Sequence, residues 1–179
     1  MADSDSVVGS KSQSASNGQV LVRRFQRGEE HLIRQIYFDT THQIVAQNYS
    51  QEQVHRWAPV QYDKTAWEKR LVSTNPFVAV RNDTIVGFAE LLSDGRIDLF
   101  YCHHAFQRQG IGRALLQRLE SEAVRRRQTK LTAQVSTTGV QFFSRMGFQT
   151  TQETNKIVCG QAATQFHMSK TLTDVVADV

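Results

Sequence analysis

The sequence predicts a single domain of the α/β class, in which helices flank a largely antiparallel sheet. Two observations support this prediction. Three strand-like runs, 77–80, 85–92 and 96–102, follow one another with short turn sequences between them, which is typical of an antiparallel meander. The third run leads through a loop with two glycines into a helical pattern, so strands and helices share one unit. A length of 179 residues suits one domain with a sizeable core.

The N-terminal half of this domain is expected to begin with a strand at 20–25 (VLVRRF). Helical segments follow as far as about residue 73. The first of them places its larger side chains at helical spacing: Leu32, Ile33, Ile36, Tyr37 and Ile44. The segment 81–84 (RNDT) separates two strand-like runs and is typical of a hairpin turn.

The C-terminal half is expected to continue with a helix, because apolar residues recur every four positions at Ile111, Leu115, Leu119 and Ala123. After the helix, the sequence predicts a strand at 130–135, a short helix at 139–146, a turn at 147–148 and a last strand at 164–170.

The loop at 107–114 (QRQGIGRA) is predicted to bind a phosphate chain. A helix start offers backbone N–H groups that have no partner within the helix, and it carries the positive end of the helix dipole. Glycines let a ligand approach those groups closely, and Gly110 and Gly112 lie at this point. The loop is neither a mononucleotide P-loop, since no Gly-Lys-Ser/Thr follows, nor a dinucleotide motif, since Leu115 occupies the place of the third glycine.

Together with the downstream strand, helix, Gly-Phe turn and last strand, the loop resembles the Gln/Arg-x-x-Gly-x-Gly/Ala signature of the GNAT N-acetyltransferase superfamily, over roughly residues 19–171. The resemblance implies a GNAT-like fold, with a mixed, mostly antiparallel central sheet flanked by helices. It also implies acetyl-CoA as co-substrate. The residues expected to contact acetyl-CoA are Tyr101, Cys102, Gln107, Arg108, Gln109, Gly110, Ile111, Gly112, Arg113, Ser136 and Phe143.

Acetyl transfer to an amine requires a base, because an amine with a pKa of about 10.4 is protonated at neutral pH. In GNAT enzymes an acid on the fourth strand often serves, and Asp98 matches it; apolar neighbours would desolvate this carboxylate. The structural alternative is an ion-paired aspartate at a strand end. Glu90 is the second candidate, and strict alternation predicts that it shares one face with Val86 and Phe88.

Many GNAT relatives protonate the leaving thiolate with a tyrosine at the position of Phe143, where the hydroxyl is missing here. Three accounts remain: water protonates the thiolate, Tyr101 or another residue substitutes, or catalysis has been lost. Backbone N–H groups near Tyr101 or Cys102 are expected to polarise the thioester carbonyl. Ser136 stands where many relatives carry an asparagine and can still hydrogen-bond the cofactor.

The segments between the first two strands usually wall the acceptor site in GNAT proteins. Here Tyr49 and Trp57 are candidate substrate-binding residues for an apolar or cationic acceptor, and packing on the sheet is the equal alternative. Trp67 is expected to be a core residue.

Composition adds few constraints: the apolar content is 40% and the net charge is +4. The absence of a long apolar run or a signal-peptide pattern predicts a soluble, cytoplasmic protein without a membrane partner. The basic residues 125–127 fall at a helix end, where cations are favoured, so nucleic-acid binding is not expected. The two cysteines, Cys102 and Cys159, lack metal-ligand spacing, and no metal is predicted.

Residues 1–18 are rich in serine and are expected to form a disordered tail, followed by the domain at 19–172 and a C-terminal tail at 173–179. The last strand offers an edge through which a homodimer is possible. We expect an N-acetyltransferase that moves an acetyl group from acetyl-CoA to a primary amine by direct attack in a ternary complex. The alternative is a non-catalytic CoA-binding or acetyl-CoA-binding regulatory module.

Overall fold

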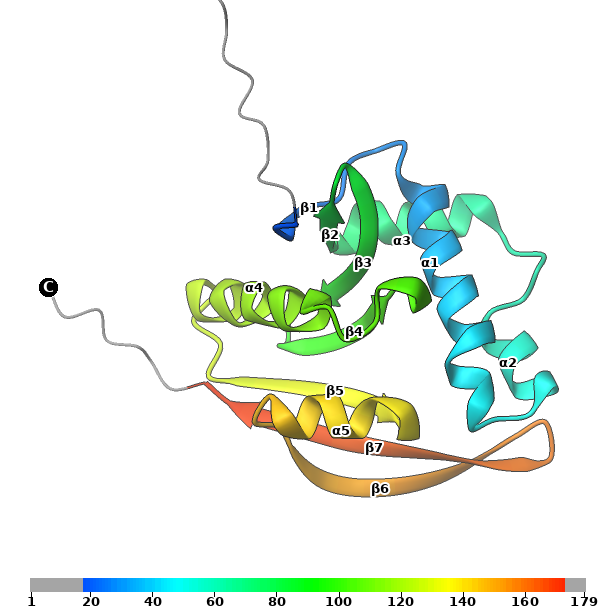
Figure 1. Cartoon of the computed structure of the whole chain (residues 1–179). Coiled ribbons are helices and arrows are strands. Elements are labelled where there is room, and N and C mark those ends of the chain that lie inside the picture. The colour runs from blue at the N-terminus through cyan, green and yellow to red at the C-terminus, as the bar shows by residue number, and fades with distance from the viewer. Residues whose placement is uncertain (1–17, 173–179) are drawn as a thin grey trace, which may run out of the picture.

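The computed structural model describes residues 18–172, which form one seven-stranded sheet with helices on both faces (Figure 1). The strands are β1 (Leu21–Arg24), β2 (Phe77–Arg81), β3 (Thr84–Leu91), β4 (Arg96–Cys102), β5 (Lys130–Ser136), β6 (Gln149–Val158) and β7 (Gln161–Thr171). The α-helices are α1 (Glu30–Gln43), α2 (Gln51–Trp57), α3 (Lys64–Thr74), α4 (Ile111–Arg125) and α5 (Thr137–Arg145). Within residues 18–172 there are also two short 3-10 helices, η1 (Val45–Gln47) and η2 (His104–Phe106).

The sheet has the order β1-β2-β3-β4-β5-β7-β6, and β4 with β5 is its parallel pair. All other neighbouring strands are antiparallel. This arrangement confirms the predicted mixed, mostly antiparallel sheet. The parallel pair is short: Arg96 is opposite Thr132 and Ile97 is opposite Ala133, and no later residues of the two strands pair. The sheet therefore opens into a gap between β4 and β5 (Figure 1).

Most predicted elements are present, with shifted bounds. The hairpin turn between β2 and β3 is confirmed, and Asn82 and Asp83 both have positive φ there. No strand is predicted where β6 lies. Its sequence (QTTQETNKIV) is polar on both faces because it is an exposed edge strand, so the burial pattern that marks most strands is missing. The predicted tails lie outside the described residues, apart from Gly18.

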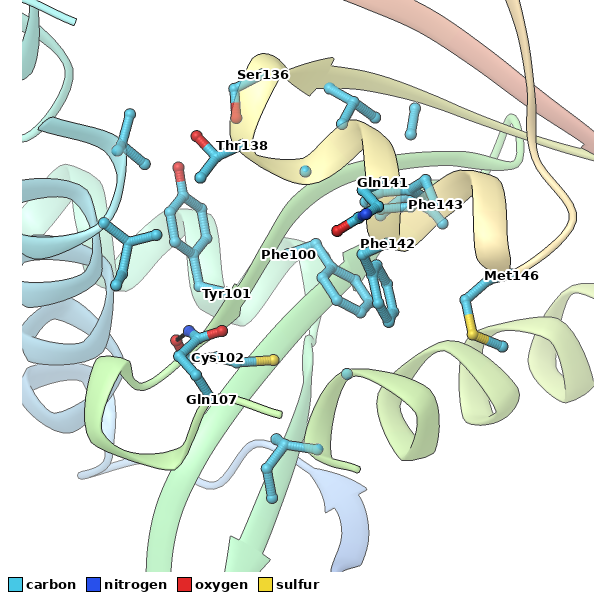
Figure 2. Close-up of a pocket in the computed structure, with 18 of the residues that line it drawn as sticks. Phe100, Tyr101, Cys102, Gln107, Ser136, Thr138, Gln141, Phe142, Phe143 and Met146 are labelled. Carbon is cyan, nitrogen blue, oxygen red and sulfur yellow. Dashed lines mark hydrogen bonds between the residues drawn. The ribbon is translucent and has the colours of Figure 1, made fainter. Parts of the chain in front are cut away.

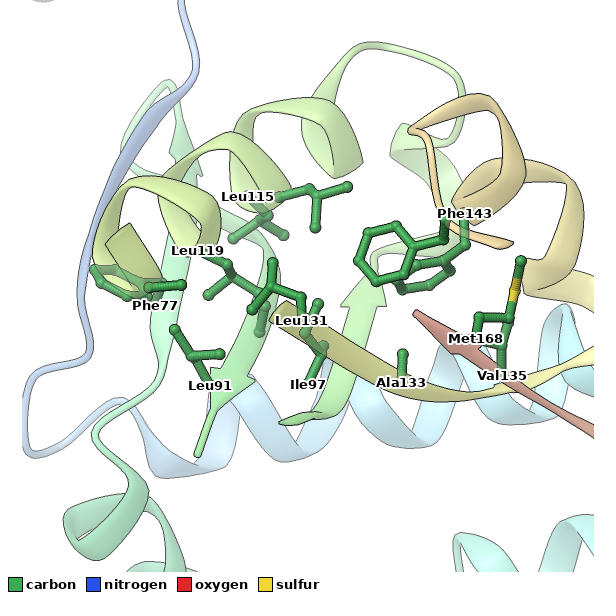
Figure 3. Close-up of a cluster of buried hydrophobic side chains, with 14 of the residues drawn as sticks. Phe77, Leu91, Ile97, Leu115, Leu119, Leu131, Ala133, Val135, Phe143 and Met168 are labelled. Carbon is green, nitrogen blue, oxygen red and sulfur yellow. The ribbon is translucent and has the colours of Figure 1, made fainter. Parts of the chain in front are cut away.

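Two apolar clusters lie on opposite faces of the sheet. The larger one packs α4 and α5 against the strands and includes the fully buried Leu115 and Leu119 (Figure 3). The smaller one packs α1 and α3, with Ile33, Leu71 and Phe88 fully buried. Burying one such leucine contributes about 1.5–3 kcal/mol, so packing rather than helix propensity holds these helices in place.

A bulge in β3 changes the expected faces of this strand. Ala79 pairs with Gly87 and Val80 pairs with Ile85, which leaves Val86 as an extra residue. Val86 consequently belongs to the α4 cluster, whereas Phe88 belongs to the α1–α3 cluster. The prediction that Val86 and Phe88 share a face is wrong, because strict alternation fails at a bulge.

None of the helices between residues 18 and 172 has the length and apolar character to cross a bilayer.

Candidate active site

A cavity of about 780 Å³ fills the gap where β4 and β5 diverge. Its walls come from β4, β5, α5, the loop before α4 and the start of α4 (Figure 2). Its size lies within the range of sites that hold small molecules and cofactors. The cavity exists because β4 and β5 stop pairing after Ile97 and Ala133, while β4 continues beside β3 and β5 continues beside β7.

The predicted phosphate loop forms one mouth of this cavity. Gly110 precedes α4 with a φ of 83°, a left-handed conformation that favours glycine, and a Cβ there would meet open space. Ala114 is the first residue of α4 whose N–H bonds back along the helix, to Gly110 O at 3.0 Å. The preceding N–H groups, including those of Ile111 and Gly112, are therefore available to an anion.

Side chains hold this loop against β4 and β2. Gln107 donates through Nε2 to the carbonyl oxygen of Cys102 at 2.8 Å, and Arg81 donates to Oε1 of Gln109. The side chains of Gln107 and Gln109 thus hold the loop in place through contacts within the protein. That they also contact the cofactor stays a prediction. Arg108 and Arg113 are exposed and line the cavity, so their charges are available to a polyphosphate.

Gly112 has a second role that the sequence pattern does not predict. A Cβ at this position would lie 3.0 Å from the ring of Phe142 and 3.5 Å from Sγ of Cys102. The glycine therefore lets Phe142 of α5 pack against the first turn of α4. Phe142 also contacts Phe100, with ring centroids 5.5 Å apart (Figure 2).

The open edge of β4 faces the cavity. The backbone N–H of His103 donates to Val86 O at 2.9 Å on the β3 side. Because successive residues of a strand direct their N–H groups to opposite sides, the N–H of Cys102 is directed toward the gap. The Cys102 carbonyl accepts the Gln107 amide and Thr40 Oγ1 at 3.1 Å. An unpaired strand edge of this kind can pair with an extended ligand.

Comparison with known proteins identifies the family to which these features belong. Residues 45–172 match the family model of the acetyltransferase (GNAT) domain. The chain belongs to the GNAT acetyltransferase family. It is an acetyl-CoA-dependent N-acetyltransferase.

Relatives support the same assignment. The chain is 29% identical over 149 residues to YafP of Escherichia coli strain K12, an uncharacterized N-acetyltransferase, and the match covers 83% of this chain and 94% of that protein. A GCN5-related N-acetyltransferase from Rhodopseudomonas palustris superposes with a TM-score of 0.80 at 25% identity, covering 90% and 100% of the two chains. YncA of Salmonella typhimurium, solved with its cofactor acetyl-CoA, gives a TM-score of 0.67 at 20% identity, covering 88% and 96%.

Within this GNAT site, the two candidate bases belong to one ion-pair network on the α3 side of the sheet. Arg70 donates through Nη2 to Glu90 at 2.5 Å and also to Asp98, while Thr74 Oγ1 donates to Glu90 at 3.1 Å. Asp98 also accepts from Arg96. The hydrogen bonds that Arg70 donates to Glu90, more than the one to Asp98, raise the pKa of Arg70 above its usual value.

The two carboxylates differ in access. Glu90 is fully buried, so its oxygens face Arg70 and Thr74 rather than a substrate. The Asp98 side chain is 25% exposed and lines the cavity. The arrangement agrees with the ion-paired alternative for Asp98, and its role as a base stays a prediction.

Tyr101 extends from β4 toward α1. Its ring meets Tyr37 edge-on at 4.9 Å and stacks on Phe88 at 5.7 Å. Burial raises the pKa of the Tyr101 hydroxyl above its usual range, so this hydroxyl is neutral at physiological pH. Burial likewise raises the pKa of the Cys102 thiol to about 12, which leaves it protonated and unsuited to nucleophilic attack.

The start of α5 brings hydroxyl groups to the cavity. Ser136 and Thr138 both line it, and Thr138 Oγ1 is buried without a hydrogen-bond partner among residues 18–172. A buried hydroxyl without a partner is expected where a ligand supplies the bond. Thr138 carries no motif, so the sequence could not single it out. Phe143 is only 6% exposed and packs edge-on against Phe100 and Phe148.

The acceptor-side candidates Tyr49 and Trp57 touch each other edge-on at 4.7 Å. The Tyr49 hydroxyl donates to Thr164 O at 2.8 Å and accepts the Thr137 N–H at 3.2 Å, which ties the segment before α2 to β7 and α5. Trp57 lines the main cavity and also a second cavity of about 500 Å³ on the α1–α3 side. Trp67 packs with the smaller core cluster, as expected, and lines the second cavity.

One group of possible metal ligands lies beside the cofactor loop in the described part of the chain. Asp39, His103 and His104 place ligand atoms within 4.8 Å of one another. Two of these groups already have protein partners: Gln35 donates to both oxygens of Asp39, and His103 Nδ1 accepts the Ala105 N–H at 3.2 Å. His104 Nδ1 is buried and has no hydrogen-bond partner among residues 18–172. Desolvation, and then the neighbouring His104, lower the pKa of His103.

Proposed function

We propose that the chain transfers the acetyl group of acetyl-CoA to a primary amine by direct attack in a ternary complex. The observation that carries this proposal is the unpaired edge of β4 beside the glycine loop. A pantetheine arm can extend along that edge while the pyrophosphate meets the N-terminus of α4. The thioester would then lie at the gap, where the Cys102 N–H can stabilise the carbonyl oxygen as negative charge develops.

The arrangement of the two cavities supports attack by an amine that approaches the thioester from the side opposite the cofactor. Tyr37 and Trp57 line both the cofactor cavity and the second cavity next to α3. An amine that enters the second cavity can approach the thioester without displacing the cofactor. Both reactants can therefore be bound together, which direct attack requires.

We assign proton removal from the amine to Asp98, acting through water. Its carboxylate has about four acceptor positions, and Arg70 and Arg96 occupy two of them. Its partial exposure leaves room for a water on the remaining positions. Glu90, which is fully buried, positions Arg70 and through it Asp98.

Protonation of the leaving thiolate is the second proton transfer. Phe143 has no hydroxyl, and Tyr101 lines the cavity with a neutral one. We assign this step to Tyr101 or to water, because the thiolate of a thiol with a pKa of about 8.5 takes a proton readily from solvent at neutral pH. Kinetics of Tyr101→Phe distinguish the two donors. A tenfold loss of kcat assigns the step to Tyr101, and an unchanged kcat assigns it to water.

The proposal is tested first by calorimetric titration with acetyl-CoA. A Gly110→Asp variant puts a strained side chain and a negative charge at the loop, so affinity is expected to fall by about 100-fold or more. Asp83→Asn, which alters an exposed charge in the β2–β3 turn, is the matched control. Equal affinities of native protein and Gly110→Asp would refute the cofactor assignment.

Release of free CoA with a broad panel of amines tests the chemistry. Turnover with any of them supports transfer, and Asp98→Asn should lower it most at the acidic end of the pH profile, where the free amine is scarcest. Tight acetyl-CoA binding without turnover of any amine in the panel would contradict the proposed transfer to a primary amine.

A further inference from the structure

The second cavity, about 500 Å³ between α1, α3 and β4, has walls that are mostly aromatic. Tyr37, Trp57, Tyr62 and Trp67 line it, and Pro59 and Leu99 add apolar surface. Two guanidinium groups, those of Arg34 and Arg70, also line it. An apolar cavity that contains cations selects its ligands by charge as well as by shape.

The two arginines differ in how their charge is compensated. Arg70 is paired with the carboxylates of Glu90 and Asp98. Arg34 is only 6% exposed, and within residues 18–172 its guanidinium has no carboxylate within 4.0 Å. The Arg34 charge is therefore buried without a counter-charge, an arrangement that costs free energy.

Aromatic rings and one carbonyl surround Arg34 instead. Its guanidinium carbon lies 4.4 Å from the ring centroid of Tyr62 and 5.2 Å from that of Tyr37. Nη2 donates to Pro59 O at 2.5 Å, whereas Nη1 is buried and has no hydrogen-bond partner among the described residues. Desolvation lowers the pKa of Arg34, as expected for a cation without an anion nearby.

This environment favours an anionic ligand over a cationic one. The rings that would attract an ammonium group are already in contact with Arg34, and a second cation there would be repelled. The Asp63 carboxylate, also on the cavity wall, is exposed and caps α3 through the Ala66 N–H at 3.0 Å. One unpaired guanidinium matches the single charge of a carboxylate better than the nearly double charge of a phosphate monoester.

We propose that Arg34 binds the carboxylate of the acceptor, so that the second cavity accepts small amines that also carry a carboxylate and an apolar or aromatic side chain. This inference rests on the proposed acetyl transfer for its placement of the amine. With the carboxylate on Arg34 and the side chain among the aromatic rings, the amine can lie beside Tyr37 and Trp57, which border the thioester cavity.

Intrinsic fluorescence tests the site directly, because the only two tryptophans of the chain, Trp57 and Trp67, both line this cavity. Phenylalanine and phenethylamine differ only in the carboxylate. Each is titrated into the protein in the presence of CoA, which allows binding without transfer. Phenylalanine is expected to bind about tenfold more tightly or better, the effect of one charge-assisted hydrogen bond.

Three variants test whether Arg34 is the source of the preference for phenylalanine over phenethylamine. Arg34→Met should abolish the difference between the two ligands, and Arg34→Lys should retain part of it because the charge remains. Arg56→Gln removes an exposed arginine from neighbouring α2 and should leave the difference unchanged. Equal binding of the two ligands by the native protein, no response to either, or an unchanged preference in Arg34→Met would each overturn the inference.

Turnover with acetyl-CoA separates this inference from the proposed reaction. If phenylalanine binds through Arg34 but neither it nor any other amine is acetylated, the proposed transfer fails and the carboxylate site stands. If phenethylamine and phenylalanine are acetylated with equal kcat/KM, the transfer stands and the carboxylate site is refuted.

Discussion

The cofactor side and the acceptor side of the β4–β5 gap are built in different ways. On the cofactor side, one continuous stretch at 107–113 supplies the loop, the glycines and the first turn of α4. On the acceptor side, Arg34, Trp57, Arg70 and Asp98 come from α1, α2, α3 and β4. The difference teaches that the proposed phosphate site depends on local backbone geometry, whereas the proposed acceptor site depends on contacts between residues distant in sequence.

The ion pairs of the two sides follow the same division. On the acceptor side, Arg70 joins α3 to β3 and β4 through Glu90 and Asp98. At the far end of α4, the helix that begins at the cofactor loop, Glu122 pairs with two arginines of its own helix end and with only one residue of another element, Arg24 of β1. Disrupting each network measures how much each side depends on long-range contacts.

The largest effect is expected on the acceptor side, from Arg70→Met. Glu90 would remain fully buried with only the Thr74 hydroxyl as a partner, so the free energy of unfolding should fall by about 3 kcal/mol. Urea unfolding followed by circular dichroism measures it.

The matched control is Arg96→Met, which removes the other guanidinium partner of the partly exposed Asp98. Because that pair is open to solvent, the expected loss is below about 1 kcal/mol. Equal losses in the two variants would show that the burial of Glu90 is not what makes this network necessary.

A smaller effect is expected on the cofactor side, from Glu122→Gln. Hydrogen bonding from Arg125, and then from Arg126, lowers the pKa of Glu122 to about 2. Since the folded-state pKa lies below the unfolded value, the stabilisation is complete above about pH 5 and disappears as the pH falls toward 2. At pH 7 the variant should lose about 2 kcal/mol, less than the shift alone implies because Arg125 is exposed.

The control for this prediction is the native protein in an acid titration. Its stability should decrease between pH 5 and pH 2 more steeply than that of Glu122→Gln. Parallel curves for the two proteins would show that the Glu122 carboxylate does not stabilise the domain by anchoring the α4 C-terminus to β1.

Tyr49 bridges the two sides, and Tyr49→Phe tests whether it clamps them or binds substrate. Loss of the bonds to Thr164 O and the Thr137 N–H should lower the free energy of unfolding by about 1 kcal/mol. If the clamp is the main role, the KM of the acceptor stays within about twofold. Tyr62→Phe, which removes a hydroxyl without a protein partner in the described chain, should leave stability unchanged. A raised KM with unchanged stability would make Tyr49 a substrate contact instead.

The smallest effect is expected for Phe143→Tyr, which restores the hydroxyl found in many GNAT relatives. Because water readily protonates a thiolate whose pKa is near 8.5, kcat should change by less than about threefold. Stopped-flow measurement of thiol release checks this. A rise of tenfold or more would show that thiolate protonation limits the native protein and that water is a poor donor there.

Much of the cofactor side could be predicted from the sequence, because neighbouring residues determine it. The recurrence of Ile111, Leu115 and Leu119 indicates the buried face of α4, and all three are at most 1% exposed. The hydroxyl of Thr138 and the packing of Phe142 on Gly112 could not be predicted. Both depend on how closely α5 approaches α4, which no local pattern encodes.

The acceptor side could be predicted only in outline. Aromatic residues between the first two strands indicate a pocket wall, but the pattern cannot tell a paired arginine from an unpaired one. Because of the bulge at Val86, Glu90 does not share a face with Val86 as the sequence predicted. Its partner is Arg70, which lies 20 residues earlier in the chain, on α3.

The sequence by itself determined the fold class, the glycine loop before α4 and the membership of the GNAT family, since these depend on periodicity and on glycine at particular backbone positions. Only the tertiary structure decided which charges are neutralised. Arg34 and Arg70 are the same residue type, on α1 and α3. Arg70 pairs with two carboxylates, whereas Arg34 packs against aromatic rings. Partners that lie far apart in the chain are set by strand register and helix packing, and these emerge only when the whole domain folds.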